Sequence, residues 1–247
     1  MNNIPKLKFR YLSLEETKDI ITWTLNDKDN ILNITEGTLY LYPELKNIKE
    51  EDNIKEIIKD RYNIFIKENN NLPEEYSNIW NKYNDNYMIE ISKYFNIKWP
   101  FNYKEIEVRI GNIPVCPRYI EERTFDIHKK TKEELIDTCM HELCHFIFFE
   151  KCKEIYPNWK YEDFDSPSML WYLSEIIIDP VLNSRPIQRI YKHKFKSYDI
   201  FYNIEINNKP LMETIADIYQ NNSIEESIKE SYNYLKDNEE EFRRKIN

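Results

Sequence analysis

Two histidines and a glutamate stand at spacings that suit metal-assisted hydrolysis. His141, Glu142 and His145 form an HExxH pattern within an apolar stretch, Leu135 to Phe149, which predicts a buried helix. Residues four apart share one face of a helix, so both imidazoles can reach one ion with Glu142 beside it. Zinc held by two histidines and a third protein ligand keeps one position for water, and Glu142 is placed to take a proton from that water.

The same three residues have a simpler alternative, a pair of core histidines on an apolar helix. The chain has only four histidines in 247 residues, so a chance HExxH is expected in on the order of one percent of comparable chains. Without an ion, Glu142 would be a buried acid, which is energetically costly. Both considerations favour a metal site.

A later apolar segment, Glu175 to Asp179, has an ExxxD pattern and contains a candidate for the third ligand. With this pattern the sequence resembles the gluzincin metallopeptidases, the thermolysin-like branch of the zincins, which carry HExxH on one helix and ExxxD on a second, downstream helix. The resemblance implies that His141, His145 and Glu175 bind zinc and that Glu142 is the general base. It also implies that Asp179 accepts a hydrogen bond from the ring of His141, in keeping with the carboxylate partners that liganding histidines usually have.

The resemblance covers at its widest Ile106 to Asp179, and within it alternatives stay open. Asp163, Asp165 and Asp179 compete with Glu175 as third ligand. Asp179 can instead cap a short helix that begins at Pro180.

A hydrolase of this kind also needs a donor that stabilises the oxyanion, and Tyr or His commonly supplies it. The candidates are His193, which we prefer, and Tyr156, Tyr191 and Tyr198. The alternative for His193 is a solvated histidine among lysines.

Composition excludes several other classes of protein. The net charge is −9 and the pI is near 5.2, so we expect no nucleic-acid partner, although residues 183–198 form one basic cluster. Glycine occurs only at Gly37 and Gly111, which argues against phosphate-binding glycine loops and dinucleotide folds.

Hydropathy and cysteine spacing indicate in which cellular compartment we expect the protein. No apolar stretch is long enough to span a bilayer, and residues 1–15 lack the apolar core of a secretory signal. The four cysteines form no CxxC pair, so we expect free thiols, a cytoplasmic protein and no membrane association.

Periodicity and caps predict the elements that must position these residues. Ser13 and Glu16 form a capping box before a helix at 14–25, and Thr131 and Glu134 form another before the HExxH helix. Strict alternation predicts a strand at Ile106 to Ile110. Further predicted elements are strands at 35–43 and 123–128 and helices at 46–67, 74–95, 168–179 and 223–246.

Together these features predict an α+β, helix-dominated, zincin-like metallopeptidase fold with a small antiparallel sheet beside the active-site helix. We expect a mostly helical region at 1–100, a catalytic core at 101–198 and a helical region at 199–247, packed as one unit. The predicted function is zinc-dependent hydrolysis of a peptide or protein, which the strand at 106–110 could hold by strand addition. The alternatives are a zinc amidase for a small molecule and a catalytically inactive, zincin-like binding protein.

Overall fold

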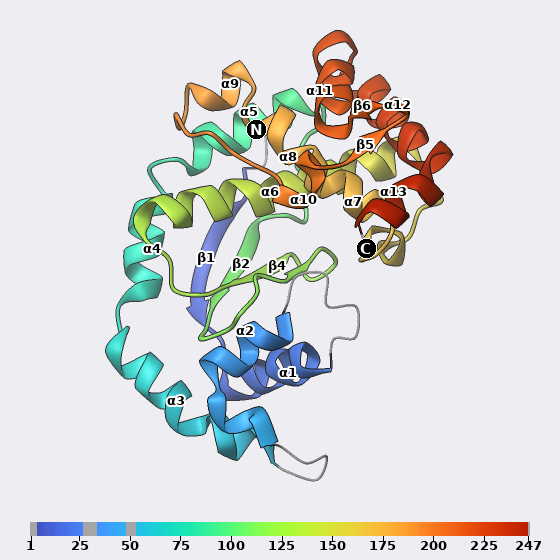
Figure 1. Cartoon of the computed structure of the whole chain (residues 1–247). Helices are drawn as coiled ribbons and strands as arrows, with labels where there is room; N and C mark the ends of the chain where they lie inside the picture. Colours follow the sequence, from blue (N-terminus) through green and yellow to red (C-terminus); the bar gives the residue numbers. More distant parts are fainter. Residues whose placement is uncertain (1–3, 27–33, 48–52, 247) are drawn as a thin grey trace. The chain divides into compact units, whose positions relative to one another are not determined.

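Helices dominate the structure, which is a computed structural model and describes residues 4–26, 34–47 and 53–246 (Figure 1). In chain order the first elements are β1 (Lys6–Tyr11), α1 (Leu14–Leu25), α2 (Ile34–Leu41), η1 (Pro43–Asn47), α3 (Ile54–Glu68), α4 (Leu72–Trp80), α5 (Asn84–Tyr94), β2 (Glu105–Ile110), β3 (Arg118–Tyr119) and β4 (Thr124–Ile127). They are followed by α6 (Lys132–Ile155), η2 (Tyr161–Phe164), α7 (Met169–Ile176), α8 (Ile178–Leu182), α9 (Arg185–Gln188), α10 (Asp199–Tyr202), β5 (Glu205–Ile206), β6 (Lys209–Pro210), α11 (Leu211–Asn221), α12 (Ile224–Asp237) and α13 (Glu239–Ile246).

The chain divides into two compact units that interleave in sequence. One unit comprises described residues up to Pro5 together with 83–104 and 137–246, and we call it the metal-site unit because it contains the candidate ligands His141, His145 and Glu175. The other, the sheet unit, comprises 6–82 and 105–136. These bounds differ from the boundaries at residues 100 and 198 that the sequence suggested. Strands β1 and β2 lie about a hundred residues apart yet pair with each other, so one unit must draw on both parts of the chain.

The larger sheet is mixed, in contrast to the antiparallel sheet predicted from the sequence. Its strand order is β1-β2-β4-β3, with β1–β2 and β2–β4 parallel and only β3–β4 antiparallel. A parallel pair needs a long crossover connection, and helices α1 to α5 lie between β1 and β2 in the chain. An additional antiparallel pair, β5–β6, belongs to the metal-site unit.

One face of this sheet is apolar and the other carries charge. Ile106, Val108 and Ile110 of β2 are fully buried, as the alternating pattern predicts. On the charged face, Arg109 is in register with Asp126, and its guanidinium donates to that carboxylate at 2.5 and 2.9 Å. Arg109 also donates a hydrogen bond to the carboxylate of Glu16, on α1, at 3.2 Å. This bond joins the charged face of the sheet to α1.

The two capping boxes correctly predicted where helices start. The sequence did not predict where longer helical segments are interrupted. The boxes of Ser13 with Glu16 and of Thr131 with Glu134 are both present. The strand predicted at 35–43 is wrong, because most of this segment forms α2, where Thr38 donates a hydrogen bond to the buried Thr24 of α1. The helices predicted at 74–95 and 223–246 are each two helices, and the early part of the 46–67 prediction includes residues 48–52, outside the described part of the chain.

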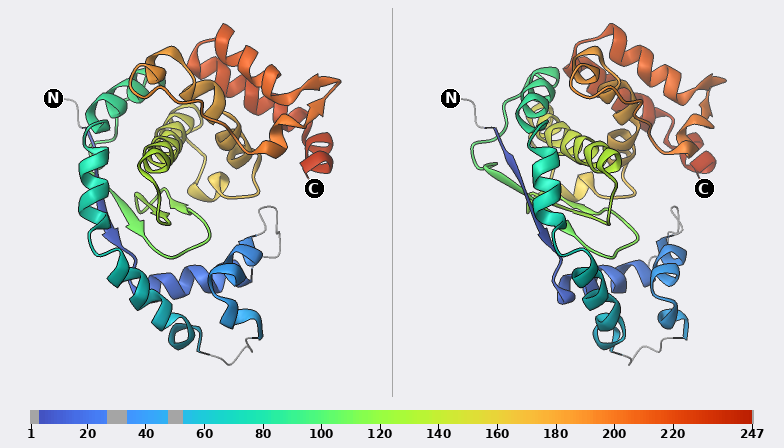
Figure 2. Two further views of the ribbon diagram at one scale, coloured as in Figure 1. Left: turned by 60° about the vertical axis from the view of Figure 1, so that its left-hand side comes forward. Right: turned by 90° about the vertical axis from the view of Figure 1, so that its left-hand side faces the viewer.

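Helix α6 is the buried centre of the metal-site unit. Apolar side chains on all of its faces, from Leu135 to Cys152, have almost no exposed surface, which is typical of a helix enclosed by other elements. The C-terminal helices α11, α12 and α13 pack in succession, with α12 also against α7 (Figure 2). Among the described residues, no helix combines the length and the apolarity that crossing a membrane requires.

Candidate metal centre

Three side chains from two helices converge as the sequence predicted. His141 and His145 lie one turn apart on α6, and their rings are 4.7 Å apart between centroids. Oε2 of Glu175, on α7, lies 3.3 Å from Nε2 of His141 and 3.5 Å from Nε2 of His145. One ligand atom from each residue can be chosen so that all three lie within 4.8 Å of one another.

These separations fit shared coordination of an ion better than direct hydrogen bonds. Zinc binds histidine nitrogen and carboxylate oxygen at about 2.0–2.2 Å, so ligand atoms at two corners of a tetrahedron lie about 3.4 Å apart. The two observed separations, 3.3 and 3.5 Å, bracket that value. A charge-assisted N–H···O bond is shorter, about 2.7–2.9 Å. Two imidazoles and a carboxylate are also a donor set that zinc accepts at hydrolytic sites.

Burial differs among the residues of the cluster. The side chain of His145 has no exposed surface and that of Glu175 only 2%, whereas that of His141 is 25% exposed. Solvent therefore reaches the cluster on the side of His141. The adjacent Glu142 is 5% exposed, so its carboxylate also lies largely out of bulk water.

The position of α6 is fixed by aromatic neighbours on both sides of the histidines. The ring of Phe149 stacks on that of His145 one turn later, with centroids 6.2 Å apart. The hydroxyl of Tyr87, on α5, donates to the backbone carbonyl of Met140, the residue before His141. Burial raises the pKa of Tyr87 far above its ordinary value, so the hydroxyl stays protonated and keeps donating.

Helix α7 ends just after Glu175, and its end is held by a later segment. Ser168 caps the start of α7 by accepting from the amide of Trp171 at 3.0 Å. The helix breaks at Ile177, three residues before Pro180, which has no amide hydrogen to offer the carbonyl four residues earlier. The hydroxyl of Ser197 donates to the backbone carbonyl of Glu175 at 2.7 Å, so the carbonyl next to this break has a partner from outside the helix.

Asp179 does not take the position that the resemblance implied. Its Oδ1 accepts from the side-chain amide of Asn183 at 2.8 Å, and its Oδ2 accepts from the hydroxyl of Tyr202 at 2.5 Å. Within the described part of the chain, no hydrogen bond joins its carboxylate to the ring of His141. The physical reason is the break at Ile177, which places Asp179 on α8, a separate helix from that of Glu175.

The two alternative aspartates are not part of the cluster either. Asp163 accepts from the backbone amide of Lys160 at 2.7 Å, which caps η2. Asp165 is exposed at the end of that element. Among the described residues, only His141, His145 and Glu175 form a group able to hold a metal ion.

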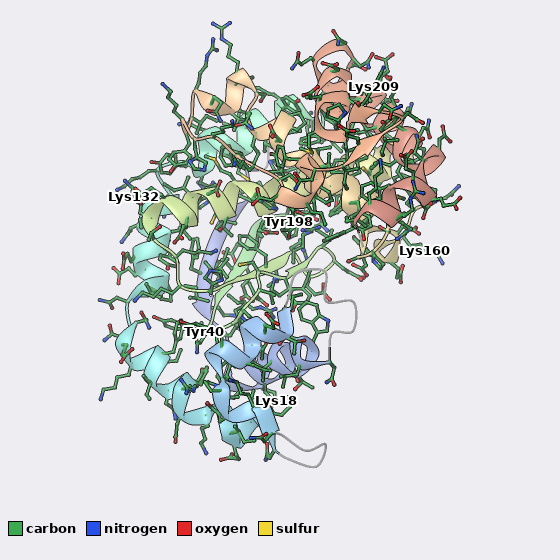
Figure 3. All side chains as sticks on the ribbon, in the orientation of Figure 1. Lys18, Tyr40, Lys132, Lys160, Tyr198 and Lys209 are labelled. Carbon is green, nitrogen blue, oxygen red and sulfur yellow. The ribbon has the colours of Figure 1, made fainter. Side chains whose placement is uncertain are left out.

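The candidate oxyanion donors have different surroundings. Nε2 of His193 lies 3.5 Å from the carboxylate of Asp137, one helical turn before His141 on α6. Its ring stacks on that of Tyr191, with centroids 5.7 Å apart. Tyr198 follows Ser197 directly and is 37% exposed (Figure 3).

Tyr156 is not brought to the cluster. It lies beyond the last turn of α6, fifteen residues after His141, and at 1.5 Å per residue this is about 22 Å along the axis. Its ring instead stacks on that of Trp159, with centroids 4.0 Å apart. The structure therefore gives Tyr156 a packing role.

Two residues that support the site had no identifiable signal in the sequence. Tyr87 follows the apolar period of its helix, as a core residue does, and Ser197 lies in a basic stretch twenty-two residues after Glu175. Their hydrogen bonds go to backbone carbonyls, which no side-chain pattern reveals. Only the three-dimensional path of the chain identifies them.

In comparisons with known proteins, no family model, no curated protein and no solved structure matches this chain.

Proposed function

We propose that the protein is a zinc-dependent peptidase. The observation that carries this proposal is the position of one carboxylate oxygen of Glu175 at 3.3 and 3.5 Å from the two Nε2 atoms of His141 and His145. These separations suit a single tetrahedral ion. The preference for peptide bonds over other substrates comes from the resemblance of the HExxH and ExxxD patterns to gluzincins.

In this proposal the roles of the chain's own residues are distinct. His141, His145 and Glu175 hold the ion, which when bound polarises a carbonyl oxygen and lowers the pKa of a water molecule. Glu142 takes a proton from the attacking water and later delivers it to the amine nitrogen that leaves. Its 5% exposure keeps the carboxylate largely out of bulk water, so that the proton passes between groups within the site.

Zinc content and peptide cleavage test the proposal together. Purified protein should contain about one zinc per chain by elemental mass spectrometry, and it should cleave members of a mixed peptide library in a reaction that a chelator stops and added zinc restores. Glu142→Gln should retain zinc and lose cleavage, since the amide cannot accept the proton. The matched control, Glu133→Gln, changes an exposed glutamate in the first turn of the same helix and should keep both properties.

Two outcomes would overturn the proposal. One is protein that binds no zinc even when the metal is supplied during purification and refilling. The other is undiminished cleavage by Glu142→Gln. Cleavage confined to small amides, with every peptide in the library intact, would assign the site to an amidase instead.

A further inference from the structure

A concentrated positive charge lies next to the candidate metal centre. From residue 185 to residue 196 the chain carries five basic side chains and no acidic one, in a protein whose net charge is −9. The five are Arg185, Arg189, Lys192, Lys194 and Lys196, and all are exposed. We call residues 185–196 the basic segment.

The basic segment concentrates several positive charges without acidic partners in one short stretch of the described chain. Elsewhere many lysines pair with neighbouring glutamates, as Lys229 does with Glu225 at 2.7 Å and Lys236 with Glu239 at 2.5 Å. The five basic side chains form no ion pair or side-chain hydrogen bond with any residue that the structure describes. Their charge is therefore available to a ligand.

The second half of the basic segment is extended and one-sided. Exposure alternates strictly from Lys192 to Ser197, with the three lysines exposed and His193, Phe195 and Ser197 turned inward to different degrees. Phe195 is 1% and Ser197 8% exposed. The alternating exposure places the three lysines together on the solvent side of this segment, where we call them the lysine row.

Contacts fix this row to the helices that supply the metal ligands. His193 contacts Asp137 of α6, one turn before His141, and Ser197 binds the carbonyl of Glu175. Between them, Phe195 and Asn183 exchange hydrogen bonds at 2.8 and 3.0 Å. In Figure 1 the connection descends from α9 past α6 to α10. The row therefore has a defined position beside the cluster.

We infer that the three lysines of this row bind acidic side chains of an extended peptide substrate. The inference rests on the proposed peptidase function and adds a substrate class to it. An extended peptide with acids at alternate positions presents them on one side, as this segment presents its lysines. A nucleic acid is disfavoured because three such charges are few for a protein that is otherwise acidic.

The binding is electrostatic and partly solvated. Individual exposed ion pairs are worth about 0.2–1 kcal/mol, so three pairs together predict a preference of roughly tenfold at low salt. The preference should decline as salt rises, because the Debye length falls to about 8 Å at 0.15 M.

Binding can be measured apart from hydrolysis with zinc-loaded Glu142→Gln protein. The probes are a heptapeptide of alternating alanine and glutamate with an uncharged fluorophore and its glutamine counterpart, followed by fluorescence anisotropy at 50 mM salt. The glutamate peptide should bind about ten times more tightly. Lys194→Glu/Lys196→Glu should abolish this difference. Lys98→Glu/Lys209→Glu changes the net charge equally at two exposed lysines of the same unit and should preserve it (Figure 3).

Equal affinity for the two peptides would overturn the inference, and so would an equal loss of preference in the control variant. Equally tight binding of a single-stranded oligonucleotide of the same charge would also overturn it, since the row would then select any polyanion. A failure of the parent proposal is visible separately, as wild-type protein that binds no zinc or that cleaves no member of the mixed peptide library.

Discussion

The hydroxyl of Ser197 and the backbone carbonyl of Glu175 are joined by a buried 2.7 Å hydrogen bond. The bond connects the segment that carries the lysine row to the helix that carries the third candidate ligand. Hydrogen-bond partners behind a ligand orient it, and losing them typically weakens metal binding by 10- to 100-fold. In this chain the hydrogen bond is made to the backbone carbonyl of Glu175 and not to its carboxylate.

Replacing Ser197 by alanine should therefore weaken zinc binding by roughly tenfold. Competition with a chromogenic chelator measures the affinity, and the visible spectrum of the cobalt-substituted protein reports the ligand geometry. Ser197→Thr retains a hydroxyl and should restore both. Ser227→Ala removes a similar buried hydroxyl that donates to the carbonyl of Ile218 at 3.3 Å, and its zinc affinity should match that of the wild type. Unchanged affinity and cobalt spectrum in Ser197→Ala would contradict the positioning role.

Replacing Glu175 by glutamine should uncouple thermal stability from zinc. If the proposal holds, zinc at about 100 times its dissociation constant should stabilise the wild-type protein by about 2.7 kcal/mol, and the variant should lose most of this gain. Without metal, the variant should be at least as stable as the wild type, because a carboxylate with 2% exposure no longer has to be buried. Thermal melts with and without zinc measure both effects, and an equal zinc-induced shift in the two proteins would refute the assignment of Glu175.

Truncating Phe148 should destabilise the metal-site unit strongly. This side chain of α6 is fully buried and packs edge-to-face against Phe95 and Phe149. Phe→Ala at such positions costs about 3–5 kcal/mol, and thermal or urea unfolding measures the loss. Phe101→Ala, at an 82% exposed position in the same unit, should change stability by no more than about 0.5 kcal/mol. Similar losses in the two variants would contradict the arrangement around α6.

The sheet unit should lose stability in acid through Glu16. Hydrogen bonds from Arg10 at 2.7 and 2.8 Å are the largest cause that lowers the pKa of Glu16 from 4.5 to about 2. A depressed folded-state pKa means that the contribution is complete above pH 4.5 and is lost as the pH falls toward 2. Unfolding free energies across this range should show a steeper decline for the wild type than for Glu16→Gln. Parallel pH profiles would show that the pair contributes nothing.

The convergence of the candidate metal ligands could be predicted from the sequence because it depends largely on local spacing. The interval of four between His141 and His145 needs only a helix, and a capping box marked where that helix starts. Glu175 was predicted through the ExxxD pattern and converges with them. The role predicted for Asp179 required Glu175 and Asp179 to lie on one continuous helix. The helix breaks at Ile177, so the two residues lie on different helices.

Long-range pairing was the part that the sequence did not disclose. Lys6–Tyr11 alternates apolar and polar residues as β2 does, yet its parallel pairing with Glu105–Ile110 depends on a crossover of about a hundred residues. The strand predicted at 35–43 was wrong for a related reason, because this segment packs against α1 as a helix, with Thr38 bonded to the buried Thr24. Tertiary contacts commonly override local preference in this way.

Helix α6 has a practical consequence for work with fragments. Its first turn belongs to the sheet unit and the remainder to the metal-site unit, so a single cut of the gene cannot separate the two. A fragment starting at residue 137 would keep all three candidate ligands but lose α5 and the Tyr87 hydroxyl that contacts Met140. This fragment would expose apolar side chains of α6 that α5 covers in the whole chain, so it should aggregate into inclusion bodies. Activity assays therefore require the full polypeptide.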